Sequence, residues 1–168
     1  MAYISTNWVN GKTPINATNL NNMEKGIVEA NKKIVASAYG SLASLSLTAK
    51  TITQLTLDTW DIRSDTSFAF SGGGIKCPYD GYVLVTGNVY FRENGSEDCR
   101  RGVYIKKNGT EVHSQYLNEK SSSAGVIGSG VCLLEVKAGD VITLNARQSV
   151  ATTCAPSNSG TRLIVAYI

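Results

Sequence analysis

Few residues in this chain of 168 amino acids are suited to catalysis. His113 is the only histidine, so a Ser-His arrangement or a histidine-based metal site would depend on that one residue. It follows Asn108-Gly109, a dipeptide typical of hairpin turns, where a solvated strand histidine is the expected outcome. Gly72-Gly73-Gly74 lacks the Lys-Ser/Thr of a phosphate-binding loop and is expected to form a turn. The sequence therefore predicts a protein that is not an enzyme.

The cysteines and acidic residues do not form a recognisable metal motif. None of the four cysteines belongs to a Cys-x-x-Cys pair, so a zinc site is not expected. Cys77 and Cys132 lie in apolar, strand-like segments and are expected to be buried thiols. Cys99 and Cys154 lie in polar segments, where a disulfide and two free thiols both agree with the sequence. The acidic stretch 93–98 lacks the spacing of a calcium loop and is expected to be solvated. We expect neither a metal nor a cofactor.

Several polar and aromatic side chains are suited to binding a sugar, because the apolar face of a sugar ring can stack on an aromatic ring. Binding residues are most often carried by exposed loops on a rigid scaffold. We expect such loops at residues 92–101, 116–123 and 151–160, and a further aromatic platform at a strand end. The predicted receptor-binding residues are Trp60, Arg92, Arg101, Tyr116, Asn118, Glu119 and Lys120.

One segment has helical periodicity. Its apolar residues are spaced alternately by three and four, as in the a and d positions of a coiled coil: Leu20, Met23, Ile27, Ala30 and Ile34. Asn16 is a suitable N-cap. We predict an arm over residues 1–15 and a helix over 16–38. A helix of this length is marginal alone in water, so it is expected to pair with copies of itself or to pack on its own β domain.

The remaining chain is predicted to be a β-sandwich. Residues 39–50 are rich in Ser, Ala, Leu and Thr and are expected to be a linker. From residue 51 the apolar pattern has a period of two, with turn signals about every ten residues. Asn108-Gly109 predicts a type I′ hairpin turn. Many short strands without intervening helices predict an antiparallel jelly-roll sandwich over residues 51–168.

Two predicted strands, 82–85 and 163–168, are apolar on both faces. An antiparallel strand with one face in water should alternate apolar and polar residues, so the second face must be covered. Either a neighbouring subunit or the loops of the same chain could cover it, and we expect the subunit. The predicted trimer interface comprises Leu20, Met23, Ile27 and Ile34 of the helix, with Tyr82, Leu84 and Tyr167 of the sandwich.

Composition argues against nucleic-acid and membrane roles. The net charge is +3 and the Lys and Arg residues are scattered, so no basic stripe for phosphate binding is present. The charged fraction, 17%, is low, and no apolar run approaches the ~20 residues of a membrane span. The N-terminus lacks a secretory signal pattern. We expect synthesis in a cytoplasm, or removal of a signal before residue 1.

Residues 75–85, IKCPYDGYVLV, and 136–142, VKAGDVI, together with the aromatic and apolar C-terminal strand, carry a family resemblance. They resemble the entry to the central strand, and the approach to a late strand, of complement globular-head and tumour-necrosis-factor-like jelly rolls. The resemblance covers roughly residues 51–168. It implies a ten-stranded domain that assembles as a trimer.

Residues 11–27, GKTPINATNLNNMEKGI, resemble the N-terminal element of tail and baseplate fibre proteins from phages of Gram-positive bacteria. That resemblance implies an arm that attaches a trimeric fibre to the virion and starts its coiled coil. The shaft here is much shorter than in long fibres, which favours a compact appendage.

Together these features predict a homotrimeric phage appendage, assembled in the bacterial host cytoplasm and carried on the virion. Its N-terminal arm would attach to a baseplate or other structural protein, and its head would bind a host cell-surface glycan without catalysis. One alternative is a structural decoration, collar or head fibre without a receptor. A more distant alternative is a glycan-cleaving enzyme, against which the shortage of paired carboxylates argues.

Overall fold

The computed structural model describes residue 12 and residues 16–30, 33–92, 99–119, 125–150, 152–157 and 160–168. The chain divides into two compact units, Met1–Lys33 and Ile34–Ile168. We call the second unit the head. The described residues form one helix and thirteen strands, and every strand belongs to the head. None of these residues forms a helix that is long and apolar enough to cross a membrane.

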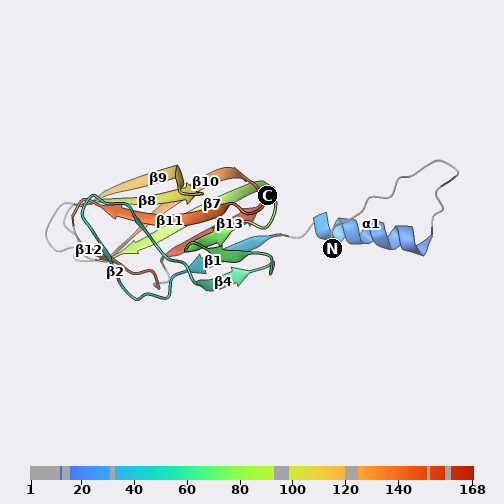
Figure 1. The fold of residues 1–168 in the computed structure, drawn as a ribbon, viewed down its shortest axis with the longest axis horizontal. Coiled ribbons are helices and arrows are strands. Elements are labelled where there is room, and N and C mark those ends of the chain that lie inside the picture. Colours follow the sequence, from blue (N-terminus) through green and yellow to red (C-terminus); the bar gives the residue numbers. More distant parts are fainter. Residues whose placement is uncertain are drawn as a thin grey trace. The chain divides into compact units, whose positions relative to one another are not determined.

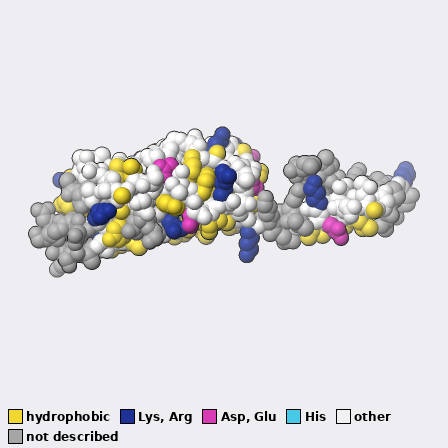
Figure 2. Space-filling model, turned by 90° about the horizontal axis from the view of Figure 1, so that it is seen from below, with side chains coloured by type: hydrophobic (Ala, Val, Ile, Leu, Met, Phe, Trp, Pro, Cys, Tyr) yellow, Lys and Arg dark blue, Asp and Glu magenta, His cyan; other side chains and the backbone are white. Residues whose placement is uncertain are grey.

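The helix of the first unit, α1 (Ala17–Ala30), begins where the sequence predicts. The Asn16 side chain accepts a hydrogen bond from the backbone N–H of Asn19 at 2.9 Å, which satisfies one of the donors left open at a helix start. The apolar stripe of α1 comprises Leu20, Met23 and Ile27, and all three are exposed. Figure 2 shows hydrophobic atoms at the surface of this unit.

The described helix ends at Ala30, and the prediction of a helix over 16–38 is wrong for residues 35–38. Residues 35–39 instead form a strand, β1 (Val35–Tyr39), that is hydrogen-bonded on both sides. Ile34 packs against the core of the head and therefore does not belong to a helical seam. Burial of Ala36 and Ala38 between neighbouring strands outweighs their helix propensity.

The predicted linker, 39–50, also belongs to the head. It contains β2 (Leu45–Leu47), which pairs with a late strand, and Leu47 is fully buried. Gly40 donates its backbone N–H to the carbonyl oxygen of Pro156 at 3.2 Å. The head therefore begins at Ile34 rather than at residue 51.

The head is an antiparallel sandwich of two sheets, which confirms the predicted jelly-roll fold class (Figure 1). Sheet A has the order β2-β12-β7-β13-β1-β4. Both β12 and β13 pair with one side of β7, and β10 pairs with its opposite side. Sheet B has the order β5-β6-β11-β8-β9, and β3 pairs with β11. The remaining strands are β3 (Thr53–Gln54), β4 (Thr59–Arg63), β5 (Ala69–Ser71), β6 (Gly74–Lys76), β7 (Gly81–Phe91), β8 (Cys99–Lys107), β9 (Thr110–Glu119), β10 (Val126–Val136), β11 (Val141–Gln148), β12 (Thr152–Cys154) and β13 (Arg162–Tyr167).

The core lies between the inner faces of the two sheets. Val83 and Val85 of β7 are fully buried opposite Ile105 and Leu144 of sheet B. Each fully buried side chain of this kind contributes about 1.5–3 kcal/mol relative to an exposed one. Gly87 permits close approach of the sheets, because a Cβ there would lie 2.7 Å from the Leu144 side chain. The core positions therefore follow the period-two pattern of the long strands.

The sandwich has two ends that differ in what they carry. At the proximal end the chain enters β1, and Val35 pairs with Ala166 near the C-terminus. At the distal end, Phe91 pairs with both Val126 and Cys154. The ends of β7, β9 and β11 therefore meet the starts of β8, β10 and β13 away from the entry point (Figure 1). Of the predicted loops 92–101, 116–123 and 151–160, the described residues lie at the distal end, and residues 99–101 and 116–119 belong to β8 and β9 rather than to loops.

Candidate binding surfaces

The outer side of sheet A carries exposed hydrophobic side chains on two neighbouring strands. Leu84 of β7 pairs with Leu133 of β10 and with Ala166 of β13, so these three lie in one row across the sheet. Leu84 is 42% exposed and Leu133 58% exposed. We call this surface the apolar face; its exposed members are Tyr82, Leu84, Ile127, Val131, Leu133 and Ile168. A contiguous group of this kind is typical of a protein interaction site.

The part of sheet A beside the apolar face carries an ion pair among mixed polar and apolar residues. Arg162 of β13 forms an ion pair with Asp61 of β4, and Asp61 also accepts a hydrogen bond from the Ser37 hydroxyl at 3.3 Å. The Arg162 guanidinium lies 6.0 Å from the centre of the Tyr39 ring. Most exposed hydrophobic residues of sheet A thus lie on β7, β10 and the C-terminal residue, and β4 adds Ile62, which is 50% exposed.

The outer side of sheet B carries a cluster centred on Gly102 of β8. Gly102 pairs with Tyr116 of β9 on one side and with Arg147 of β11 on the other. Arg100 and Tyr104 lie two residues before and after Gly102 and share its face of the sheet. A Cβ on Gly102 would lie 2.9 Å from the Tyr104 ring and 3.0 Å from the Tyr116 ring. We call Arg100, Gly102, Tyr104, Tyr116 and Arg147 the Gly102 cluster.

The side chains of the Gly102 cluster hold one another in place. The Tyr104 and Tyr116 rings meet edge to face, with centroids 5.6 Å apart, and their hydroxyl groups are hydrogen-bonded. The Arg100 guanidinium lies over the Tyr116 ring, 4.0 Å from its centroid. Burial, and then the Tyr116 hydroxyl, raise the pKa of Tyr104 to about 12. Tyr104 therefore stays a neutral phenol at physiological pH.

Of the predicted receptor-binding residues, Tyr116 and Asn118 lie on the outer side of sheet B. Asn118 is exposed and pairs with Arg100, so it borders the Gly102 cluster. Arg92 is exposed at the distal end, where it donates to the Ala43 carbonyl oxygen at 2.9 Å. The Glu119 side chain and all of Lys120 lie outside the described residues.

The prediction for Arg101 is wrong, because this side chain is only 1% exposed. It points between the sheets like Val103 and Ile105, its neighbours at a spacing of two. The guanidinium lies 5.6 Å from the centre of the Phe91 ring, and it donates to the Arg92 carbonyl oxygen at 3.2 Å. Arg101 is therefore part of the interior of the head.

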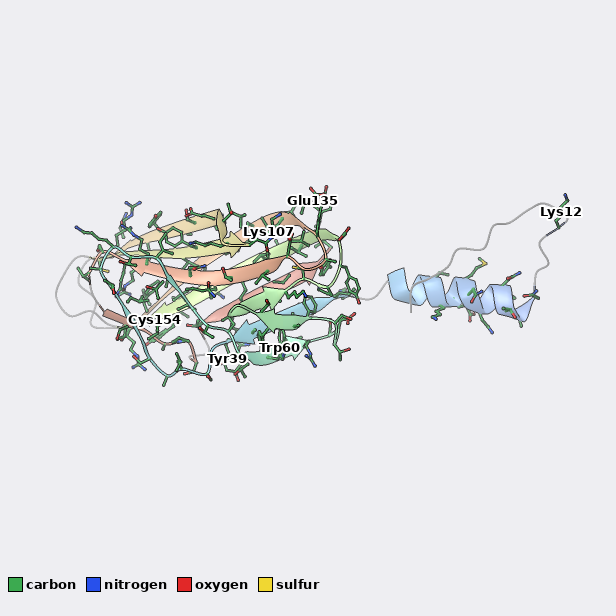
Figure 3. All side chains as sticks on the ribbon, viewed as in Figure 1. Lys12, Tyr39, Trp60, Lys107, Glu135 and Cys154 are labelled. Atoms are coloured by element: carbon green, nitrogen blue, oxygen red, sulfur yellow. The ribbon has the colours of Figure 1, made fainter. Side chains whose placement is uncertain are left out.

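Trp60 lies apart from the Gly102 cluster, on the edge strand β4 of the other sheet. Its ring stacks on Phe70 with centroids 4.0 Å apart and planes inclined by 15°. The Arg63 guanidinium lies 5.6 Å from the Trp60 ring centre. Figure 3 shows Trp60 close to Tyr39. Trp60 therefore packs within its own edge of the head, and the structure does not bring it together with Tyr116.

The predicted trimer residues are divided among three places. Leu20, Met23 and Ile27 are exposed on α1, and Tyr82 and Leu84 are exposed on the apolar face. Ile34, by contrast, packs on the core of the head. Tyr167 also packs on that core, and its hydroxyl donates to the Tyr79 carbonyl oxygen at 2.8 Å. Sequence reasoning missed Val131 and Leu133, although the run 131–134 is apolar on both faces and could have indicated them.

All four cysteines are free thiols, so the two alternatives for Cys99 and Cys154 resolve in favour of no disulfide. Burial raises the pKa of Cys77 to about 11 and that of Cys154 to about 12. Figure 3 shows Cys154 at the distal end of the head. The described residues contain no group of three or more His, Cys, Asp and Glu side chains that could hold a metal ion.

A shallow depression of about 440 Å³ lies at the proximal end, between the turn before β7 and the turn before β11. Its lining consists mainly of small or apolar residues, and Lys76 is its charged member. The Tyr79 hydroxyl at its rim donates to the Asp65 carboxylate at 3.0 Å. Within the described chain this depression does not combine a nucleophile with a base and an oxyanion donor.

Comparison with known structures identifies the fold of the head. No protein-family model matches the chain, and no curated protein matches it. Murine APRIL, in a crystal structure at pH 5.0, superposes with a TM-score of 0.61 at 16% identity, covering 82% of this chain and all of that one. The Eiger TNF of S. frugiperda superposes with a TM-score of 0.61 at 11% identity, covering 81% of this chain and 92% of that one. The head is therefore a tumour-necrosis-factor-like jelly roll.

Proposed function

We propose that the chain is a non-enzymatic, homotrimeric phage appendage whose head binds a host cell-surface glycan. The observation that carries the proposal is the apolar face. Its row Leu84–Leu133 lies on the outside of a sheet whose inner side is already fully packed, so a second layer has to come from another molecule. Copies of the same chain supply that layer in closed symmetric assemblies.

The energy available from this association is substantial. Covering the exposed halves of six large hydrophobic side chains contributes about 1 kcal/mol each. The stripe Leu20–Met23–Ile27 of α1 has coiled-coil spacing and is also exposed. A helix of 14 residues is marginal alone, so a three-stranded coiled coil would stabilise it. Both units of the chain are thus expected to associate with copies of themselves.

The attachment role rests on the resemblance of residues 11–27 to phage fibre proteins. The helix start at Asn16 and the exposed stripe of α1 are consistent with an element that begins a coiled coil. Within the arm, residues 1–15, the structure describes Lys12, and its side chain is exposed. In this proposal the arm binds a baseplate or other structural protein of the virion.

The host-binding role rests on the arrangement of the head. The chain enters the head at the proximal end, and the strand ends that flank the predicted binding loops lie at the distal end. A trimer would present three such ends together, and three weak sites on one particle gain strength through effective concentration. This arrangement is well suited to a surface that carries a repeated glycan.

Two measurements test the proposal. Light scattering at micromolar concentration is expected to give three times the chain mass of 17.9 kDa. The fluorescently labelled protein is expected to bind cells of at least one strain in a panel of Gram-positive bacteria, and extracted wall glycan in excess should abolish the binding. A monomeric mass would contradict the trimer, and failure to bind any strain would contradict the host-binding role.

One observation favours the alternative of a structural virion decoration. The two aromatic rings predicted as sugar platforms are in use within the chain, because Trp60 stacks on Phe70 and the Arg100 guanidinium covers Tyr116. A decoration protein would form the same trimer and would bind no cell in the panel. The cell-binding measurement therefore separates the two functions.

A further inference from the structure

Two arginines of the Gly102 cluster are positively charged and form no ion pair with the described residues. Arg100 is exposed, and its guanidinium rests on the Tyr116 ring. Arg147 is half-buried and donates its Nε–H to the Lys50 carbonyl oxygen at 3.0 Å. Within the described part of the chain, neither guanidinium forms an ion pair with a carboxylate. Both cations therefore remain available to an external anion.

The sheet register places these cations around one small area. Gly102 lies between Arg147 on β11 and Tyr116 on β9, and Arg100 lies two residues away on the same face of β8. Diagonal neighbours of this kind on a sheet are about 7–8 Å apart, a span that long side chains bridge easily. Among the described residues, the Arg147 guanidinium lowers the pKa of Tyr104 and the Glu111 carboxylate raises it, so both charges act on the tyrosine pair. Arg100 and Arg147 are the two cations of the cluster.

Stacking gives Arg100 a defined geometry. A guanidinium held flat on an aromatic ring keeps its N–H groups in the plane of the fork, where they can donate two parallel hydrogen bonds to a phosphate or a carboxylate. The ring also restricts the Arg100 side chain before binding, so less conformational entropy is lost when a ligand binds. The same stacking prevents a sugar ring from using that face of Tyr116. The cluster is accordingly better suited to an anionic group than to a neutral sugar.

We infer that the Gly102 cluster is a binding site for the anionic groups of a polyhydroxylated polymer. Arg100 is the anchoring cation and Arg147 the second cation. The exposed Asn118 amide is placed to bond polymer hydroxyls. Tyr104 is only 2% exposed, so its part is to hold the half-buried Tyr116 ring through the bond between the two hydroxyl groups. This inference rests on the proposed host-binding function and specifies its ligand as an anionic glycan or polyol. Phosphate and carboxylate groups share the chemistry that the fork recognises.

The experiment measures binding of the full-length protein to three immobilised polymers at low salt. Poly(glycerol phosphate) carries phosphate, polyglucuronate carries carboxylate, and dextran is neutral. We expect at least one polyanion to bind about tenfold or more tightly than dextran, with an affinity that falls as salt is raised. The two polyanion arms identify which anion is preferred.

Three variants connect this binding to the cluster. Arg100→Gln should weaken polyanion binding about tenfold, and Arg147→Gln should weaken it severalfold. Arg100→Lys keeps the charge without the planar fork and should recover only part of the loss. Arg63→Gln is the matched control, because Arg63 also lies over an aromatic ring, that of Trp60, but on the other sheet. It should bind like the unmodified protein.

Equal binding to dextran and both polyanions, or unchanged affinity in Arg100→Gln at an unchanged melting temperature, would overturn the inference. The cell panel separates this failure from failure of the proposed function. Cells bound equally well by the unmodified protein and by Arg100→Gln would place host binding elsewhere on the head. Absence of binding to every cell and every polymer would contradict both.

Discussion

Asn108 and Asp140 join two turns at the proximal end of the head. The Asn108 side-chain amide donates to the Asp140 carboxylate at 2.7 Å, and the carboxylate also accepts from the backbone N–H of Lys137 at 2.9 Å. The carbonyl oxygen of the same Asn108 side chain, Oδ1, accepts a hydrogen bond from the backbone N–H of Val141 at 2.8 Å. The neighbouring Lys107 ammonium donates to the Glu135 carbonyl oxygen at 2.9 Å (Figure 3). These bonds fix the ends of β8, β10 and β11 relative to one another.

The Asp140 carboxylate is expected to make stability depend on pH. The backbone N–H of Lys137, and then the Asn108 amide, hold the pKa of Asp140 below its usual value, so the folded state binds this proton less readily than the unfolded state. The contribution is complete above about pH 4 and is lost as the pH falls through the lowered pKa. Asp140→Asn should cost about 2 kcal/mol at neutral pH.

Urea denaturation of the two proteins between pH 7 and pH 2 measures this difference. It should stay constant down to about pH 4 and then decrease. A difference that stays constant down to pH 2 would mean that the carboxylate charge contributes nothing to the fold.

A charge on the apolar face should separate the subunits without unfolding them. Leu84→Glu places a carboxylate in the row shared with Leu133, where association would desolvate it. We expect the mass by light scattering to fall to the 17.9 kDa of one chain, with an unchanged circular dichroism spectrum. Ile52→Glu is the control, since Ile52 is exposed just before β3 of sheet B. If Leu84→Glu still forms a trimer, the apolar face is not part of the subunit interface.

Gln148 is a buried amide that the fold does not use. It is fully buried, and among the described residues neither its side-chain nitrogen nor its oxygen has a hydrogen-bond partner. Gln148→Met keeps the shape and removes the desolvated polar atoms, so it should raise the free energy of unfolding by about 1–2 kcal/mol. Gln54→Met is the matched control, because the Gln54 amide donates to the Gly72 carbonyl oxygen. It should be neutral or destabilising, and a large loss of stability in Gln148→Met would contradict the prediction.

The buried thiols should resist alkylation in the folded protein. With pKa values of about 11 and 12, Cys77 and Cys154 are about a thousandth or less thiolate at pH 8, and burial also denies access to the reagent. Iodoacetamide treatment followed by peptide mass spectrometry should leave both unmodified. The same treatment in urea should modify all four cysteines, and a disulfide-linked peptide would show that the free-thiol state is wrong.

The boundary of the head can be tested by truncation. A chain that begins at Ile34 retains β1 and β2 and should fold with a cooperative thermal transition. A chain that begins at Thr51 lacks β1, which separates β13 from β4, and also lacks the buried Leu47. It should be insoluble or unfolded. A folded, trimeric protein from Thr51 would contradict the assignment of residues 34–50 to the head.

The long strands and their turns were predictable because their signals are local. Asn108-Gly109 forms the predicted hairpin, with φ of 51° and 82°, the positive values that a type I′ turn requires. The long strands β7 to β11 lie within the region of predicted period-two alternation, which reports directly which face is buried. The doubly apolar segment 82–85 also correctly indicated an exposed apolar surface.

Other features depend on partners that are distant in the sequence. Residues 35–39 continue the helical spacing of Ala30 and Ile34, and they form a strand only because β13 and β4 flank them. Arg100 and Arg101 are equivalent in sequence, yet a shift of one residue decides which of them faces the interior. The Gly102 cluster depends on the register of three strands, which no local pattern specifies.

The position of β1 determines how the head responds to tension. A particle held at the distal end of the head and pulled through the chain that precedes β1 would load the head along its strands, at Val35. Hydrogen bonds between antiparallel strands are perpendicular to that direction. β1 must therefore slide between β13 and β4, and the bonds on both sides of it have to break together rather than one after another. The time for which the particle stays attached under flow would then be set by the rate at which the head unfolds. By entering through a strand that is paired on both sides, the chain makes β13 and β4 resist the pull together.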